Sequence, residues 1–301
     1  MFPAVTRVAQ IPTSITLVSG KNARDHLNRM LTTDISNDSM FTRRESIICD
    51  LNGRITSRHL HADYGSQILL MHNESESDSL RNNLTMGIPW NEECQISSGD
   101  GAIARLVIYG PDSSNILDSI GIDPADLTSE MWVEFEDSMI SKIHEGTDFC
   151  IFEMLVPVDK TLELRTNLES HGAEFGSIDS VIAIQAISGI LDIAIGTEGK
   201  IPFDLGLHNV VDLKKGCYPG QEIHARMESR DAINKTTSTF ISKQQLPLGK
   251  LQTSSDLKLE VICSKNLDDK WINVIIHQKG VNLSKEISII SDENIISIRS
   301  V

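Results

Sequence analysis

The spacing of apolar residues divides the first 237 residues into two similar runs of strands and helices. Short β-branched runs bounded by Gly, Pro or Asn predict strands, and apolar positions that recur every three or four residues predict helices. The first run predicts strands at 14–18, 47–51, 54–64 and 67–72 and helices at 22–31 and 73–86. The second predicts strands at 102–109, 132–136, 139–143 and 149–156 and helices at 113–120 and 159–171. Two successive β-α-β-β-α patterns predict an α+β fold of two ferredoxin-like units, at about 1–100 and 101–237.

Turn and cap residues place some of these boundaries. Asn52-Gly53 is the strongest two-residue hairpin signal, so the strands on either side of it should pair. Asn73, with Glu76 three residues later, predicts a capping box at the start of a helix. Gly172 predicts the C-terminal cap of the helix before it.

Helical periodicity ends near residue 238. Beyond it, β-rich runs at 257–263, 271–277 and 286–290 alternate with clusters of Asn, Asp, Ser and Gly. This pattern predicts a small all-β barrel or sandwich over 238–301, joined to residues 1–237 by a linker at 234–239.

Composition narrows the possible partners and the compartment. The chain has 301 residues with 27 basic and 42 acidic side chains, a net charge of −15, so binding to nucleic acid is not expected. No apolar run approaches the ~20 residues that span a bilayer, and the first ten residues lack the apolar stretch of a signal peptide, so no membrane contact is expected. Five cysteines without a C-x-x-C pair predict neither a disulfide framework nor a zinc site, and reduced thiols fit a cytoplasmic protein.

The segment 215–222, Lys-Gly-Cys-Tyr-Pro-Gly-Gln-Glu, carries the strongest chemical signal. Its two glycines permit backbone angles that other residues avoid, and Pro219 suits the first turn of a helix predicted at 221–227. Cys217 would then lie just ahead of a helix N-terminus with Lys214 and Lys215 beside it, and both features favour a thiolate.

The other cysteines have simpler explanations. A free cysteine is usually a small buried residue, and Cys49, Cys150 and Cys263 each stand among apolar neighbours. Cys94 gives no reason to expect a function. Cys217 differs because it has no aliphatic neighbour.

Residues 215–222 match the signature Lys-Gly-Cys-Tyr-x-Gly-Gln-Glu, and Arg226 follows at its usual place. Weaker similarity extends over most of the chain, at 20–23, 31–34 and 52–54. The chain therefore resembles the YgfZ proteins of the glycine-cleavage T-protein superfamily, which are related to mitochondrial iron–sulfur assembly factors. The resemblance implies two intertwined ferredoxin-like units plus a C-terminal β-barrel, a tetrahydrofolate in the cavity between the units, and support of iron–sulfur enzymes or cluster-assembly proteins.

The resemblance also implies roles for particular residues. Cys217 would be the functional centre, and Asp204 would bind the amino and ring N–H groups of the pterin. The remaining candidates are Lys215 and Arg226 for the glutamate tail, Tyr218 for aromatic contact or packing, and Gln221 and Glu222 for contacts or for fixing the loop. The chain departs from the family in two places: 184–191 lacks the usual arginine, and Asp204 stands where the family has a glutamate.

Three other functions remain open. A folate-dependent aminomethyltransferase or demethylase of the T-protein type needs an acid at the end of the hairpin, and residues 53–58 contain none. A scaffold would use the loop only as an interaction surface. Histidines at 59, 61, 208 and 224 could serve a metal, although hydrogen-bonded or exposed histidines are the commoner case, and no metal site is predicted.

Overall fold

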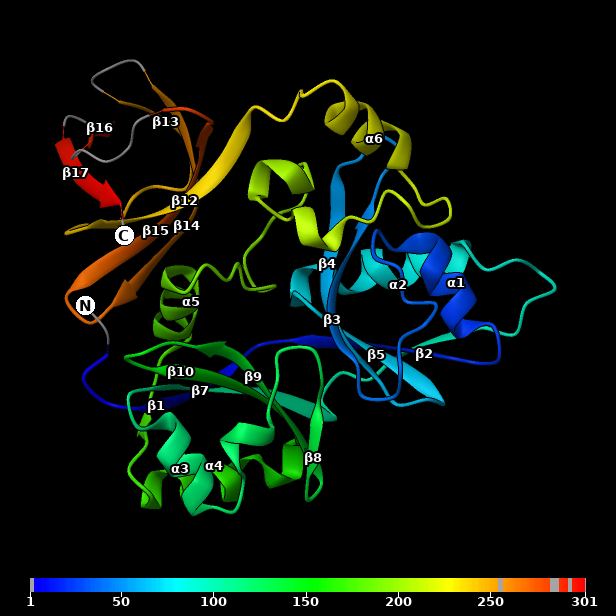
Figure 1. Ribbon diagram of the computed structural model, residues 1–301, viewed down its shortest axis with the longest axis horizontal. Coiled ribbons are helices and arrows are strands. Elements are labelled where there is room, and N and C mark those ends of the chain that lie inside the picture. Colours follow the sequence, from blue (N-terminus) through cyan, green and yellow to red (C-terminus); the bar gives the residue numbers. More distant parts are fainter. Residues whose placement is uncertain (1–2, 254–256, 282–286, 292–293, 301) are drawn as a thin grey trace.

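The computed structural model describes residues 3–253, 257–281, 287–291 and 294–300. These residues form two open sheets, a closed barrel and a set of helices (Figure 1). The expected mixture of helices with several sheets is confirmed.

The first sheet has one face covered by helices. Its strands, in spatial order, are β3 (Arg43–Cys49), β4 (Ile55–Asp63), β5 (Gln67–His72), β2 (Ser14–Ser19) and β6 (Gln95–Ser98). Helices α1 (Ala23–Met30) and α2 (Ser77–Met86) cover one face, where Leu27, Leu80 and Leu84 join the core as the helical spacing predicted.

The second sheet repeats this arrangement. Its strands, in spatial order, are β11 (Glu174–Phe175), β1 (Arg7–Ile11), β7 (Ile103–Gly110), β10 (Cys150–Pro157), β9 (Ser138–Glu145) and β8 (Val133–Phe135). Helices α3 (Ser113–Ser119) and α4 (Thr161–Ser170) pack on one face, and the short 3-10 helices η2 (Pro124–Asp126) and η3 (Val158–Lys160) precede β8 and α4.

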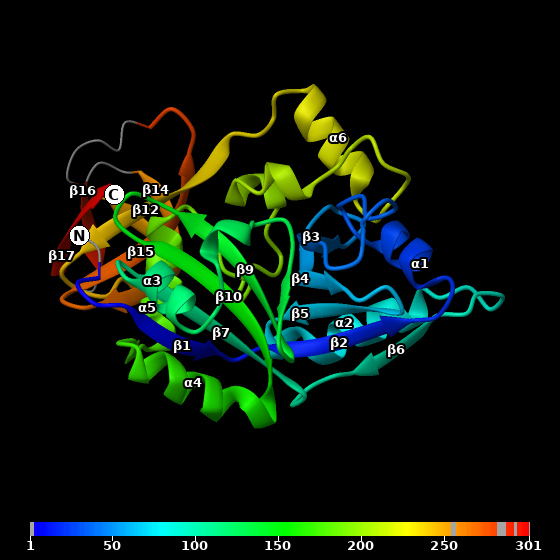
Figure 2. The ribbon, with the colours of Figure 1, turned by 60° about the horizontal axis from the view of Figure 1, so that its bottom comes forward.

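The two sheets are built from interleaved segments. The chain begins with β1 in the second sheet and passes at Pro12 and Thr13 into β2 of the first, as the blue ribbon of Figure 2 shows. Val8 of β1 packs in the core beneath α3 and α4, and Ile11 packs in the core beneath α5, so β1 is buried on both faces of the second sheet. The segment after α5 (Ile178–Ile187) returns to the first sheet, where Ile55 N of β4 donates to Lys200 O at 2.8 Å.

The capping box predicted at Asn73 is wrong. The Asn73 side chain does cap the 3-10 helix η1 (Glu74–Glu76), but it accepts from Ser75 N. Glu76 turns inward, and its Oε2 accepts from Arg58 N at 3.3 Å. The hydrogen bond between the Glu76 carboxylate and β4 therefore replaces the local capping hydrogen bond.

Helix α5 lies between the second sheet and the barrel (Figure 1). From Val181 to Ala186 every residue is buried and all but Gln185 are apolar, so the helix lacks the amphipathic stripe that marks a surface helix. Its start is fixed by Ser177 and Ser180, whose side chains each accept from the other's backbone N–H.

The barrel comprises β12 (Lys235–Ser242), β15 (Lys270–Gln278), β14 (Lys258–Leu267), β13 (Gly249–Thr253), β16 (Ile287–Ser291) and β17 (Asn294–Ser300), in spatial order. The linker expected at 234–239 is wrong, because most of it lies in β12. That strand pairs with β15 from Lys235 onward. Its run of Thr and Ser residues lacks the apolar alternation of a strand, so the sequence pattern did not predict it.

Buried ion pairs join the second sheet to the segment after α5. Arg105 of β7 is 4% exposed and bonds Glu153 of β10 at 2.5 Å and Asp192 at 2.6 Å. Arg43 of β3 bonds the other Glu153 oxygen at 2.6 Å. Burial raises the pKa of Asp192, but the Arg105 charge and its hydrogen bonds outweigh it, and the pKa falls below the ordinary value.

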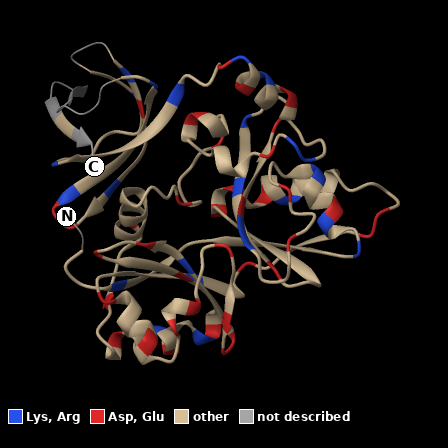
Figure 3. Cartoon of the chain, viewed as in Figure 1, with Lys and Arg blue, Asp and Glu red and all other residues tan. Residues whose placement is uncertain are grey.

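Charged residues of both signs are distributed over all three parts of the molecule (Figure 3). Among the described residues, no helix is both long enough and apolar enough to cross a membrane.

Candidate functional site: a central pocket and the cysteine loop

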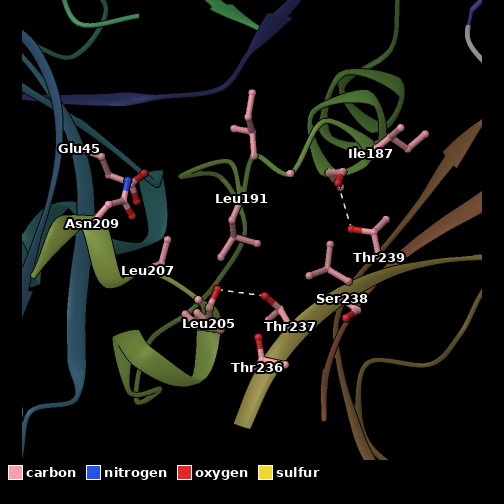
Figure 4. Close-up of a pocket in the computed structure, with 15 residues that line it drawn as sticks. Glu45, Ile187, Leu191, Leu205, Leu207, Asn209, Thr236, Thr237, Ser238 and Thr239 are labelled. Carbon is pink, nitrogen blue, oxygen red and sulfur yellow. Dashed lines mark hydrogen bonds between the residues drawn. The ribbon is translucent and has the colours of Figure 1, made fainter. Parts of the chain in front are cut away.

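A pocket of about 600 Å³ lies where the first sheet, α5 and the barrel meet (Figure 4). Its walls come from the C-terminal end of α5, the loop at 189–191, the segment at 205–209 and strand β12. The segment contains the 3-10 helices η4 (Pro202–Leu205) and η5 (His208–Val210). A volume of this size is typical of sites for small molecules.

Hydroxyl groups of β12 fasten the walls together. Thr237 Oγ1 donates to Leu205 O at 3.0 Å, and Thr239 Oγ1 donates to Ala186 O at 3.0 Å (Figure 4). The barrel strand is thereby joined to η4 and to the end of α5. Leucine and isoleucine side chains complete an interior that is part apolar and part polar.

One carboxylate, that of Glu45 on β3, faces this pocket. Its Oε1 accepts from Arg58 Nε at 2.9 Å and from Arg58 Nη2 at 2.6 Å. Arg58 is 1% exposed and also donates to Leu191 O at 2.5 Å and to Asp192 O at 3.2 Å. Arg58 therefore holds two walls of the pocket, the strand that bears Glu45 and the loop that bears Leu191.

The sequence pattern does not single out Glu45, and it marks Arg58 only as a position that lacks an acid. A signal was available in the hairpin at Asn52-Gly53. Once that hairpin is assumed, its register pairs Ile47 with Arg58 and Glu45 with Leu60, which places Glu45 and Arg58 diagonally on one face.

A groove of about 390 Å³ lies beside the pocket and reaches the cysteine loop, residues 215–222. Asn209 lines both the pocket and the groove, and the groove continues past Asp212 and Lys214, just before the loop. The pocket and the loop are thus neighbours through Asn209.

The side chain of Lys215 is buried between the cysteine loop and the end of α1. It is 9% exposed, and its Nζ donates to Asn28 O at 2.5 Å, Leu31 O at 2.6 Å and Thr33 O at 2.9 Å. These carbonyls lie at the C-terminal end of α1, where a cation is favoured. Burial lowers the pKa of Lys215 to about 8. All three ammonium protons are engaged with the protein, so the ammonium faces away from the pocket and is not free for the tail of a ligand.

Tyr218 and Gly220 pack the loop against the hairpin of the first sheet. Tyr218 is 6% exposed, and its hydroxyl lies 3.2 Å from Nδ1 of the buried His224. Nε2 of His224 in turn lies 2.8 Å from Gly53 O. Gly220 adopts a φ of +83° and lies so close to Gly53 that no Cβ would fit. Tyr218 is therefore a packing residue in this structure.

The remaining residues of the signature shape helix α6 (Gln221–Ser229). Gln221 Nε2 donates to Lys215 O at 3.2 Å, which ties the start of α6 back to the loop. Glu222 and Arg226 form an ion pair one turn apart on the exposed face of the helix. The helix begins at Gln221 as predicted, with Gly220 as its N-cap, so Pro219 precedes the first turn instead of lying in it.

Cys217 is the exposed cysteine of the chain, and it stands on this tightly built loop. Cys49 and Cys263 are buried, and burial raises the pKa of each thiol to about 12. Cys94 and Cys150 are partly buried. A solvent-facing thiol on a rigid support is able to meet a partner or reagent without any rearrangement of the fold.

Asp204 lies beside the pocket wall. It belongs to η4, next to the pocket residue Leu205, and its carboxylate pairs with Lys235 of β12 at 3.3 Å. None of the six residues predicted to bind folate lines the 600 Å³ pocket; these are Asp204, Lys215, Tyr218, Gln221, Glu222 and Arg226. The structure gives each of them contacts within the protein, and direct contact with a ligand stays a prediction.

The four histidines considered for metal binding have other surroundings. His59 is fully buried on β4, where burial lowers its pKa well below the ordinary value. His61 Nε2 lies 3.1 Å from Asp38 Oδ2, and His208 stacks on Phe203 with ring centroids 5.1 Å apart. Within the described residues, no three His, Cys, Asp or Glu side chains gather in a way that would hold a metal ion.

Comparison with known proteins places the fold. No protein-family model matches the chain, and no curated protein matches its sequence. Among solved structures, it is similar to a glycine cleavage system aminomethyltransferase T from Bartonella henselae, with a TM-score of 0.80 and 15% identity over 100% of this chain and 86% of that one. A heterotetrameric sarcosine oxidase from Corynebacterium sp. U-96 has a TM-score of 0.36 and 13% identity over 57% of this chain and 88% of that one. The chain therefore has the fold of the aminomethyltransferase T.

Proposed function

We propose that this protein binds tetrahydrofolate in the central pocket and supports the assembly or repair of iron–sulfur enzymes through Cys217. The observation that carries the proposal is the construction of the loop. Contacts within the protein engage Lys215, Tyr218, Gly220 and Gln221. Cys217 takes part in none of these contacts and faces solvent. A surface thiol held in this way, in a loop that matches the YgfZ signature, suits reaction with a partner.

The pocket fits a reduced folate in size and character. It has a volume of about 600 Å³, leucine and isoleucine walls for a flat ring system, and a carboxylate and hydroxyl groups for its polar edges. The acidic tail of the ligand would leave past Asn209 into the groove, whose lining includes the cations Arg44 and Lys214 and the acids Asp34, Asp212 and Glu228. Arg44 and the exposed Lys214 are the groups there that attract the tail. In this arrangement Lys215 and Tyr218 hold the loop, and Asp204 fastens η4 to β12 at the rim of the pocket.

The ligand and the thiol have separate tasks. Bound tetrahydrofolate supplies nitrogen atoms that carry one-carbon units. Cys217 supplies a nucleophile or a metal ligand at the surface, where an iron–sulfur enzyme or a cluster-assembly protein could reach it. We also infer that the two interleaved sheets are the ferredoxin-like units of the family.

Two measurements test the proposal. Calorimetry should show that tetrahydrofolate and folinic acid bind the purified protein. In cells that lack the protein, the wild type should restore the activity of iron–sulfur enzymes and Cys217→Ser should not, while Cys94→Ser serves as the matched control. Full restoration by Cys217→Ser would reject the thiol and leave a scaffold role for the loop. The absence of folate binding would reject the pocket assignment.

Aminomethyl transfer is the second candidate, and the shared fold favours it. The site argues against it, because the hairpin positions at which a T-protein carries acids are Ser57 and Arg58 here, and Arg58 is buried and paired with Glu45. A cation in that place cannot act as a general base toward a folate nitrogen. Turnover of an aminomethylated lipoyl carrier with tetrahydrofolate would reverse this conclusion.

A further inference from the structure

The central pocket contains a single charged side chain whose geometry is unusual. Of the fifteen described residues that line it, only Glu45 is charged. Both hydrogen bonds from Arg58 end on Glu45 Oε1, at 2.9 Å and 2.6 Å. Oε2 has no hydrogen bond to any of the described residues, and the side chain is 26% exposed. The free oxygen therefore remains available to a ligand in the pocket.

Arg58 fixes the direction of this carboxylate. Its guanidinium is almost fully buried and is held by Leu191 O and Asp192 O, so it cannot swing away from Glu45. A carboxylate that is bound through one oxygen by a fixed Arg presents the other oxygen as a preorganised acceptor. The pair is charge-balanced, so this acceptor suits a neutral N–H donor better than a cation.

Asn209 is the second polar group at this end of the pocket. Its side-chain amide carries both a donor and an acceptor, and neither has a hydrogen bond within the described residues. Thr33 Oγ1 links β3 to the segment that bears Asn209. It lies 3.3 Å from Glu45 O and 3.1 Å from Val210 O, and Val210 directly follows Asn209 in the chain. In Figure 4 the labelled side chains of Glu45 and Asn209 lie on the same side of the pocket.

We infer that Glu45 and Asn209 together recognise a 2-amino-4-oxopyrimidine edge, which pterins share with guanine. Glu45 Oε2 accepts from the 2-amino group, and the Asn209 amide pairs with the ring lactam, whose N–H and C=O match its own acceptor and donor. This inference rests on the proposed folate pocket. It goes beyond it by making Glu45, a residue outside the cysteine loop and outside the six predicted binding residues, the determinant of specificity.

A chemical double-mutant cycle tests the assignment. The ligands are tetrahydrofolate and its 2-desamino-2-methyl analogue, and the proteins are the wild type and Glu45→Gln, which keeps the shape and the acceptor for Arg58. Calorimetry should show that Glu45→Gln loses about 10- to 100-fold in affinity for tetrahydrofolate, as expected for a hydrogen bond to a charged group. The analogue should bind both proteins equally, because it lacks the amino group that Glu45 recognises.

Two further variants keep the test decisive. Glu174→Gln, an exposed acid on edge strand β11, should bind tetrahydrofolate as the wild type does. Asn209→Leu changes an exposed residue, so it should fold normally and lose affinity for tetrahydrofolate. Wild-type affinity in both Glu45→Gln and Asn209→Leu overturns the inference, and so does an equal loss for both ligands in Glu45→Gln.

The outcomes separate this inference from the proposed function. If tetrahydrofolate binds the wild type, Glu45→Gln and Asn209→Leu with equal affinity, the folate pocket is supported and the assignment of the pyrimidine edge is rejected. Binding of guanosine monophosphate without tetrahydrofolate, lost in Glu45→Gln, rejects the folate function and supports the recognition of the edge. Failure of the wild type to bind either compound rejects both.

Discussion

Gly220 packs directly against Gly53, so that a Cβ built on Gly220 would lie 2.6 Å from Gly53 Cα and 2.6 Å from Asp50 O. The contact joins the residue before α6 to the hairpin of β3 and β4, across 167 positions of sequence, and it lies three residues after Cys217. Position 220 requires glycine for two reasons: the close approach leaves no room for a Cβ, and the backbone has a φ of +83°.

We expect Gly220→Ala to lower the free energy of unfolding by roughly 2–4 kcal/mol, since a left-handed backbone costs a non-glycine residue ~1–3 kcal/mol and the overlap adds to it. Urea unfolding measures the change. Gly216→Ala is the matched control in the same loop, because nothing lies within 4 Å of its Cβ, and its effect should stay within about 0.5 kcal/mol. Equal stability of the two variants would show that the loop is not clamped at Gly220.

Alkylation should distinguish the cysteines by their surroundings. We expect Cys217 to react first with iodoacetamide at pH 7.5, because it is exposed. Cys49 and Cys263 should react last, because they are buried and their thiol pKa values of about 12 leave little thiolate. Peptide mass mapping over time gives the order.

Cys217→Ser is the control for this experiment. It should abolish the fast labelling and leave Tm nearly unchanged, since an exposed cysteine contributes little to core packing. Labelling of Cys49 as fast as Cys217 would mean that the first sheet opens readily, contrary to its packing.

Stability should fall as pH rises through the titration of Glu76. Burial raises the pKa of this carboxyl from 4.5 to about 7, although Arg58 opposes the shift. The native state therefore keeps a proton that the unfolded state loses near pH 4.5, so the contribution is fully present below that pH and is lost as pH approaches 7. Relative to wild type, Glu76→Gln should gain about 1–2 kcal/mol between pH 5 and pH 8.

Urea unfolding at four pH values measures this gain. Glu74→Gln changes an exposed acid of the same 3-10 helix and should run parallel to the wild type over the whole range. A parallel curve for Glu76→Gln as well would show that its carboxyl is ionised in the native protein at pH 5.

The buried ion pairs of Arg105 predict a large loss on truncation. Arg105→Met leaves the buried carboxylates of Asp192 and Glu153 undercompensated, and we expect a loss of about 3–5 kcal/mol of unfolding free energy. Arg7→Met breaks an exposed pair with Asp268 and should cost less than about 1 kcal/mol. Chemical denaturation of both variants makes the comparison, and similar losses would contradict the structural role given to Arg105.

Local signals in the sequence predicted the elements whose cause is local. Residues 67–72 form β5 at the predicted bounds, the hairpin turns at Asn52-Gly53, and α6 begins at Gln221. Each depends on neighbours within a few positions: β-branched and apolar spacing, a residue able to adopt a positive φ, or a glycine ahead of a helix. The mixed α and β character of the fold followed from the same signals.

Tertiary structure decided the elements whose partners are distant. The Glu76 carboxylate contacts β4 instead of closing a capping box, and the polar strand β12 forms because β15 pairs with it. Helix α5 is buried on nearly all sides because it is enclosed by a sheet and a barrel. Local spacing carries no information about such partners, since the competing contacts come from segments far away in the chain.

The candidate site shows the same division. The sequence by itself determined the loop at 215–222 and singled out Cys217, because residue types and their order define that motif. Only the folded chain assigned Lys215 to carbonyls of α1, 184 positions away at Leu31, and brought Glu45 and Asn209 to one pocket. Chain order states which groups exist, whereas their burial and pairing depend on long-range packing, and these decide whether a charge supports the fold or faces a ligand.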